Sequence, residues 1–246
     1  MSFEISNPTF YNFTELPTFD LFLAIISAIV GFYLLILLLF LGKSPFHSWI
    51  TRKTIHFIGG TYIAFIVNFF QTLFGIILAI VIFLIIFIIL ILTSKFKILN
   101  DYLILNECRE NEKNYEFLIN TVTTLIVLFI LLLVFSNYPA VFTAGTLIVS
   151  WADTSGEIIG RKLPILRYKI FNEKTLSGSL AVLVTSFISF VVVIQLYHLS
   201  IHNMWLLIIS IGSLICTLIE AFSWRWFDNL LLSIAGSAII LWVYLI

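Results

Sequence analysis

Charged side chains are scarce in this sequence. Of its 246 residues only 11% are Asp, Glu, Lys or Arg, while 61% are hydrophobic. A soluble domain of this length has too little polar surface to cover so much apolar area. The scarcity of charge therefore excludes an ordinary soluble fold and predicts an integral membrane protein.

Three further absences narrow the possibilities. The formal net charge is zero, so the overall balance gives no indication of nucleic-acid binding. The two cysteines, Cys108 in a polar stretch and Cys216 in an apolar run, are too far apart in the predicted topology for a disulfide. A cleavable signal peptide normally has a Lys or Arg before its apolar run, and none is present here. We therefore expect the first apolar run to be a retained span.

Long apolar runs are what the sequence has in abundance. A spanning helix needs about 20 mostly apolar residues, because nothing in hydrocarbon satisfies an open backbone. Clear runs occupy residues 20–41, 72–93, 117–136, 178–197 and 203–220, and runs with embedded polar residues occupy 52–70, 139–160 and 227–246. The sequence therefore predicts an all-α, polytopic membrane protein with about eight transmembrane helices.

The distribution of cations supports this division of the chain. Short connections alternate with polar ones at 42–51, 94–116, 161–177 and 221–226, and the eight-span topology places all thirteen Lys and Arg on one face. Cytoplasmic loops collect Lys and Arg. We therefore expect residues 1–246 to form one transmembrane domain with these loops in the cytoplasm and both termini on the opposite side.

A ladder of charges inside the 139–160 run is the strongest indication of a site. Asp153, Glu157 and Arg161 recur every four residues, which places them along one helical stripe, and Asp153 lies about 12 Å from the helix end. An ionisable group at such depth costs about 2.5–3.5 kcal/mol, so it is a site hypothesis by default. The carboxylate requires a cation, which is Arg161, a nearby Lys or a bound Mg²⁺.

A basic cluster opens the 52–70 run. Arg52, Lys53 and His56 are spaced so that one helical face presents them, and together they form a candidate anion site. Arg52 and Lys53 are also what membrane orientation alone places at the cytoplasmic end of a span. His56 lies about a turn deeper and is harder to explain as an anchor.

Two more polar groups fall on the same face. Lys174, Thr175, Gly178 and Ser179 precede or open the 178–197 run, where a hydroxyl and free amides at a helix start suit a phosphate, although Ser and Thr are also ordinary caps. Glu220 closes one span, and Asp228 and Asn229 open the next. Without the other groups, Glu220, Asp228 and Asn229 would be explained as ordinary helix-end residues.

In this order the four groups resemble the motifs of the dolichol, phytol and polyprenol kinases, which are distantly related to phosphatidate cytidylyltransferases. The matching residues are Arg52, Lys53 and His56; Asp153, Gly160, Arg161 and Lys162; Lys174, Thr175, Gly178 and Ser179; and Glu220, Ser223, Asp228 and Asn229. Ala152 and Ser177 depart from the usual pattern, in which Gly often precedes the Asp and Glu or Ala takes the place of Ser177.

The resemblance implies phosphoryl transfer from CTP or ATP, with Mg²⁺, to the hydroxyl of an isoprenoid alcohol such as dolichol, polyprenol, phytol or geranylgeraniol. It implies a cytoplasm-facing site in the endoplasmic reticulum of a eukaryote or the plasma membrane of a prokaryote, and no nucleic-acid partner. The implied catalytic residues are Asp153, Glu157, Lys174 and Asp228, with Asp153 and Glu220 as metal ligands. The implied nucleotide-binding residues are Arg52, Lys53, His56, Arg161, Lys162, Thr175, Gly178, Ser179 and Asn229.

Two alternatives remain open. A cytidylyltransferase that makes a CDP-activated lipid would use the same scaffold, although its family usually carries a Gly-Asp-x-x-x-Ser-x-x-Lys-Arg motif late in the chain, where Glu220 to Asn229 resembles the kinase motif instead. A transporter would use intramembrane charges as a path for an ion or solute. The charges here lie toward one face and no internal repeat is present, which disfavours a transporter.

Overall fold

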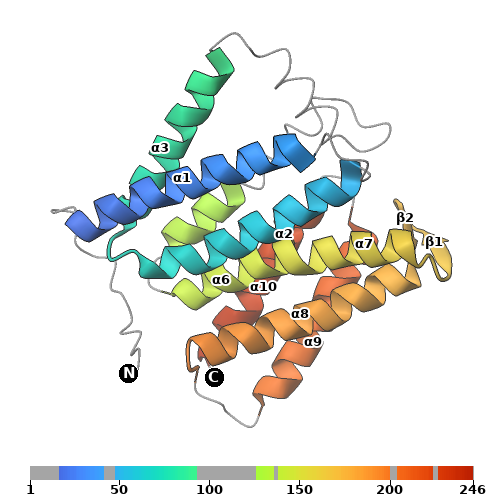
Figure 1. Ribbon diagram of the computed structural model, residues 1–246. Helices are drawn as coiled ribbons and strands as arrows, with labels where there is room; N and C mark the ends of the chain where they lie inside the picture. The colour runs from blue at the N-terminus through green and yellow to red at the C-terminus, as the bar shows by residue number, and fades with distance from the viewer. Residues whose placement is uncertain are drawn as a thin grey trace. The chain divides into compact units, whose positions relative to one another are not determined.

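Helices make up nearly all of the described chain (Figure 1). The computed structural model describes residues 17–41, 48–92, 126–135, 138–199, 204–223 and 227–245. The chain divides into two compact units, Met1–Phe117 and Leu118–Ile246, and each is described by itself. The prediction of an all-α fold is confirmed apart from one two-stranded hairpin, and the prediction of one domain stays a prediction.

In its described residues, 17–41 and 48–92, the first unit contains three helices and a short 3₁₀ turn. These are α1 (Thr18–Leu41), α2 (Ser48–Ile66), η1 (Val67–Phe69) and α3 (Leu73–Leu92). α1 packs against α3 and, less extensively, against α2. α3 is apolar throughout its length, so its backbone hydrogen bonds must close within the helix if lipid surrounds it.

A buried carboxylate caps the start of α3. Asp20 in the first turn of α1 is fully buried and accepts hydrogen bonds from the backbone amides of Gln71 and Thr72, each at 2.9 Å. Thr72 is the residue before α3, and its hydroxyl accepts a hydrogen bond from Gly75 N at 3.1 Å. This is the N-cap geometry that satisfies the free amides of a helix start. Asp20 therefore fastens α1 to the beginning of α3.

The described residues of the second unit are also mostly helical. A helical stretch at 126–134 precedes a continuous helix made of α6 (Pro139–Leu147), η2 (Ile148–Asp153) and α7 (Thr154–Lys162). Then follow α8 (Leu176–Leu196), α9 (Trp205–Phe222) and α10 (Asp228–Leu245). The runs predicted at 139–160, 178–197, 203–220 and 227–246 are helical to within two residues at each end.

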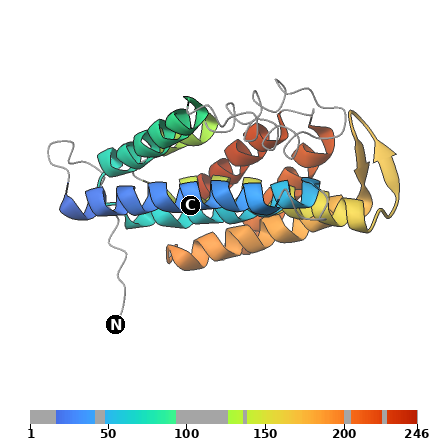
Figure 2. The same cartoon turned by 45° about the horizontal axis from the view of Figure 1, so that its top comes forward.

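Three helices among the described residues, α8, α9 and α10, are long and apolar enough to cross a membrane by length and composition. α8 packs against α7, η2 and α9, while α10 packs against α6, η2 and α9. Figures 1 and 2 both show α8 running beside α7. In consequence the start of α8 and the end of α7 lie next to each other.

The connection between α7 and α8 is a β-hairpin, where the sequence predicted a loop. Its strands, β1 (Arg167–Lys169) and β2 (Glu173–Thr175), are antiparallel and pair Arg167 with Thr175, Tyr168 with Lys174 and Lys169 with Glu173. The hairpin extends beyond the end of α7 (Figure 2). Strands of three residues are too short to produce a periodic signal in the sequence.

Candidate functional site

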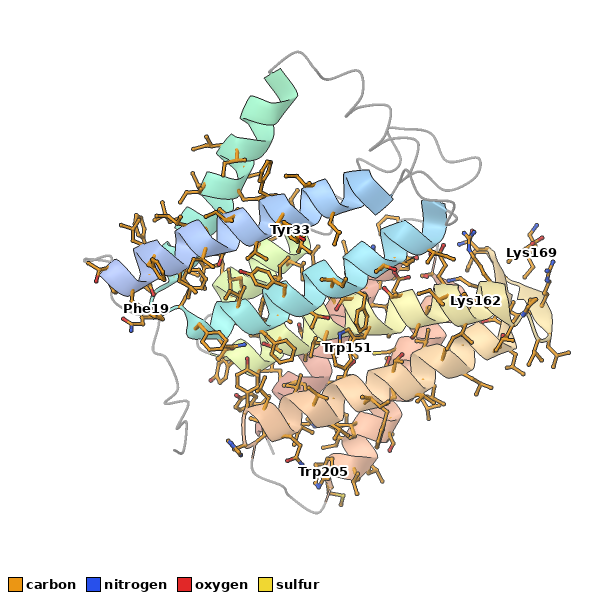
Figure 3. All side chains as sticks on the ribbon, viewed as in Figure 1. Phe19, Tyr33, Trp151, Lys162, Lys169 and Trp205 are labelled. Carbon is orange, nitrogen blue, oxygen red and sulfur yellow. The ribbon has the colours of Figure 1, made fainter. Side chains whose placement is uncertain are left out.

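The long helix of the second unit changes its winding where the deepest predicted carboxylate lies. Residues Ile148–Asp153 are π-helical, and Asp153 is the last of them, with only 6% of its surface exposed. π-helical turns inside α-helices are rare and occur frequently at functional sites. Figure 3 labels Trp151 in this segment and Lys162 further along the same helix, at its hairpin end. The sequence contained no signal for the change of winding.

The predicted charge ladder is formed in its second half. Arg161 Nη2 lies 2.9 Å from Glu157 Oε1, one turn back along α7. This is the i,i+4 spacing at which opposite charges meet on a helix surface. Glu157 is mostly buried, so the pair keeps a carboxylate and a guanidinium together beside the start of α8.

Lys174 is the centre of a second and more deeply buried charge cluster. Its ammonium on β2 donates a hydrogen bond to Oε1 of Glu220 on α9. Burial disfavours the charged ammonium, but the attraction of Glu220, and beyond it of Asp228 and Asp153, outweighs this effect and raises the pKa of Lys174 above its ordinary value of 10.5. Lys174 therefore brings together groups from β2, α9, α10 and η2.

The three carboxylates of this cluster are all buried. Asp153 and Glu220 are each 6% exposed and Asp228 is 4% exposed. Glu220 is in the last turn of α9, and Asp228 is the first residue of α10, where the helix dipole favours a negative charge. Asp228 Oδ1 accepts a hydrogen bond from the amide of Asn229 at 2.9 Å. Glu220 and Asp228 thus lie at the end of α9 and the start of α10, and Asp153 in η2 joins them through its attraction for Lys174.

Two buried oxygens of the cluster have no hydrogen-bond partner within the described part of the chain: Oε2 of Glu220 and Oδ1 of Asn229. A buried acceptor without a partner is costly, and both atoms are of the type that Mg²⁺ prefers. No group of three or more His, Cys, Asp or Glu side chains among the described residues is arranged to hold a metal alone. The donor set fits a Mg²⁺ that one or two carboxylates share with phosphate oxygens.

Gly178 serves the packing of two helices. Its amide donates to the Thr175 hydroxyl at 3.1 Å, which makes Thr175 the N-cap of α8. A Cβ added to Gly178 would lie 2.8 Å from Gly156 O and 3.3 Å from Gly160 Cα. The amide of Gly178, predicted to face phosphate, is thus used within the cap. The glycines instead let α7 approach α8 backbone to backbone, as small residues do in membrane helices.

Side chains that the sequence reading did not select hold the hairpin in place. The Tyr168 hydroxyl on β1 shares a hydrogen bond of 2.6 Å with the hydroxyl of Ser179 on α8. Asn172 Nδ2, between the strands, donates to Ser223 O after α9 at 3.2 Å. These contacts fix the strand that carries Lys174. A hairpin prediction would have identified Tyr168, because it is paired directly with Lys174.

The remaining predicted cluster lies in the first unit. Lys53 is buried in α2 and His56 is half-buried one turn further along. The side chain of Arg52 lies outside the described residues, as do most of the predicted loops at 42–51 and 94–116 and part of that at 221–226. The assignment of Arg52, Lys53 and His56 to the nucleotide stays a prediction.

Comparison with known proteins adds no family to this description. No protein-family model, curated protein or solved structure matches the chain. The function must therefore be inferred from the motifs and from the geometry around Lys174.

Proposed function

We propose that this protein is a membrane-embedded kinase that transfers a phosphoryl group from a nucleoside triphosphate, with CTP as the favoured donor, to the hydroxyl of an isoprenoid alcohol. One observation carries the proposal: a half-buried lysine just before α8 lies within electrostatic reach of three buried carboxylates, one from η2 and two from the ends of α9 and α10. A lipid alcohol and a water-soluble polyanion can meet only at such a boundary between membrane and water.

The proposal includes the membrane topology. Eight spans put every cation on one face, and the described cations of the second unit all fall between the end of α7 and the start of α8. That is the end at which Lys174 and its carboxylates lie. By the positive-inside tendency this end faces the cytoplasm, where nucleotides are available, and both termini face away.

In this proposal the cations bind the phosphate groups of the nucleotide, and a carboxylate accepts the proton of the alcohol. Lys174 uses one of its three N–H donors on Glu220, which leaves two for phosphate oxygens. Arg161 and Lys162 at the end of α7 add positive charge beside the same loop. Positioning and charge neutralisation of this kind are the main contributions of a protein to phosphoryl transfer.

In the reaction proposed here, the alcohol oxygen forms a bond to the γ-phosphorus while the bond from that phosphorus to the β–γ bridging oxygen breaks. The nucleoside diphosphate leaves, and the alcohol proton passes to the carboxylate of Asp153 or, where Asp153 holds Mg²⁺, to that of Asp228. Asp153 and Glu220 are the residues proposed to hold Mg²⁺, which when bound would neutralise charge on the phosphates. Oε2 of Glu220 and Oδ1 of Asn229 are available for this role.

The direct test uses purified protein in lipid nanodiscs. Dolichol, a shorter polyprenol, phytol and geranylgeraniol are each supplied with CTP or ATP labelled at the γ-phosphate. We expect label to move to one class of alcohol and CDP or ADP to be released. Asp153→Asn should abolish transfer, while Glu173→Gln, an exposed change beside Lys174 in the hairpin, should retain it. Full activity of Asp153→Asn would refute the assignment.

Two changes to this assay separate the alternatives: a phosphorylated lipid with CTP labelled at the α-phosphate, and vesicles with a solute but no nucleotide. Release of pyrophosphate with incorporation of the cytidylyl group into lipid would indicate a cytidylyltransferase. Solute uptake into vesicles that requires no nucleotide would indicate a transporter. A transporter does not explain why Lys174, Glu220 and Asp228 gather toward one end of the helices rather than near the midplane. The cytidylyltransferase is disfavoured by the motif from Glu220 to Asn229, which resembles that of the kinases.

A further inference from the structure

The β1–β2 hairpin has two chemically different faces. Residues directly opposite each other in an antiparallel pair project to the same side, and neighbours along a strand alternate. Tyr168 and Lys174 are paired and both face the helices, because one bonds Ser179 and the other Glu220. The pair of Lys169 with Glu173 consequently projects from the opposite face, where both residues are exposed. Arg167 is also exposed, while its partner Thr175, at the end of β2, turns inward to cap α8.

The outer face of the hairpin carries cations, and its tip carries apolar side chains. Arg167 and Lys169 are exposed, and Figure 3 shows Lys169 at the outer edge of the hairpin, away from the helices. At the tip, Phe171 is 59% exposed and Ile170 is also exposed. Residues 161–171 contain four cations and no acid, and the residue paired with Lys169 across the hairpin is the acid Glu173.

An exposed leucine just before β1 adds to this surface. Leu166 has a positive φ of 48°, a backbone conformation that Gly or Asn adopts with less strain. Its carbonyl and that of Ile165 both accept from the amide of Leu176, which holds the turn in place. The Leu166 side chain is nevertheless 70% exposed. A strained turn that presents leucine to the outside is explained if that side chain has an apolar environment.

We propose that the outer face of the hairpin docks on the membrane in which the protein sits. Leu166, Ile170 and Phe171 enter the interfacial layer, and Arg167 and Lys169 bind the phosphate groups of anionic lipids. Charge complementarity selects this occupant, because cations and apolar groups interleaved beside a span match an anionic leaflet. The hairpin continues directly into α8, so it lies within reach of the headgroups.

The surface is separate from the proposed nucleotide site. Arg167 and Lys169 project from the face of the sheet opposite to Lys174, so they do not converge on the buried carboxylates. The inference rests on the proposed membrane topology but not on the proposed reaction. Docking would hold the outside of the hairpin that carries Lys174, while Tyr168 and Asn172 hold its inside.

The test places a fluorescent label at the hairpin tip. In a variant with Cys108→Ser and Cys216→Ala, a cysteine introduced as Ile170→Cys carries a polarity-sensitive dye. The full-length protein is placed in nanodiscs of phosphatidylcholine alone or of phosphatidylcholine and phosphatidylglycerol in equal parts, each with a brominated lipid as quencher. We expect a blue shift and quenching at least about twofold stronger in the anionic membrane. The double variant Arg167→Gln/Lys169→Gln should abolish the difference.

Control positions make the outcome decisive. A label at Val184→Cys, on the exposed side of α8, should be quenched equally in both membranes. A Val184 label that stays in water would overturn the membrane topology and this inference with it. An Ile170 label that stays in water in both membranes, or is quenched equally in both, would overturn this inference but not the membrane topology. A shift that depends on protein density would report contact with a second copy of the chain and would also overturn it. No nucleotide or alcohol is needed, so this result is independent of the kinase assay.

Discussion

Thr72 donates two hydrogen bonds to one carboxylate oxygen of Asp20, from its amide at 2.9 Å and from its hydroxyl at 2.5 Å. The other oxygen of Asp20 accepts from the amide of Gln71. One buried acid thus satisfies three donors that lie about fifty residues away in sequence, at the point where α3 begins. The contact is structural, because every oxygen of Asp20 already has a partner.

Removal of this acid should destabilise the first unit. Each buried donor left unsatisfied costs about 1–3 kcal/mol, so Asp20→Ala should lower the free energy of unfolding by at least about 2 kcal/mol. Reversible unfolding in detergent, followed by circular dichroism, measures the change. Gln71→Ala is the matched control, because Gln71 contributes its backbone amide to this contact, and it should cost less than about 0.5 kcal/mol. Equal effects of the two substitutions would contradict the capping role.

The ion pair of Lys174 and Glu220 should show strong energetic coupling. Removal of one partner of a buried pair costs about 3–5 kcal/mol, because the other charge stays buried without compensation. Lys174→Met and Glu220→Gln should each be strongly destabilising, and the double variant should cost less than their sum by about 2 kcal/mol or more. A double-mutant cycle of unfolding free energies gives this coupling.

The outer face of the hairpin provides the matched control for that cycle. Lys169 and Glu173 are opposite charges paired across the same two strands, but both are exposed. Exposed pairs contribute less than about 1 kcal/mol, so Lys169→Met and Glu173→Gln should be nearly additive. Coupling as strong as that of Lys174 with Glu220 would show that burial is not the source of the effect.

The pH dependence of the same pair follows from the raised pKa of Lys174. A lysine whose pKa is higher in the folded protein adds stability in full below the unfolded value of 10.5 and loses it as pH rises through the folded value. The difference in unfolding free energy between the wild type and Lys174→Met should therefore be constant from neutral pH to about 10 and shrink above 10.5. Lys169→Met, measured in parallel, corrects for the general loss of cationic charge. A difference that shrinks already between pH 7 and 9 would contradict the prediction.

How far the sequence predicts this structure depends on how local each signal is. The helices were predictable, because a run of about 20 apolar residues has few alternatives to a helix. The selection of Lys174, Glu220, Asp228 and Asp153 as charged groups at one face came from span counting. Their mutual arrangement around Lys174 is a property of the fold, and the sequence reading assigned Lys174 to phosphate without naming Glu220 as its partner.

The features that escaped prediction depend on distant or weak signals. The partners of Asp20 lie 51 and 52 residues further along the chain. The strands β1 and β2 have three residues each, so no alternation could reveal them. The π-helical turn that ends at Asp153 packs against α8 and α10, and its residues carry no pattern that distinguishes it from an α-helix.

The close approach of α7 and α8 gives the last prediction. A Cβ on Gly178 would meet Gly156 O and Gly160 Cα, which are backbone atoms that cannot rotate away, so Gly178→Ala should destabilise the protein by about 1–3 kcal/mol. Gly59 in α2 is the matched control, because nothing lies within 4 Å of the position its Cβ would take. There alanine should stabilise the helix by about 0.5–1 kcal/mol. Thermal unfolding in the same detergent compares the two variants. Opposite signs are the expected result, and stabilisation by both substitutions would show that α7 and α8 are further apart than these glycines require.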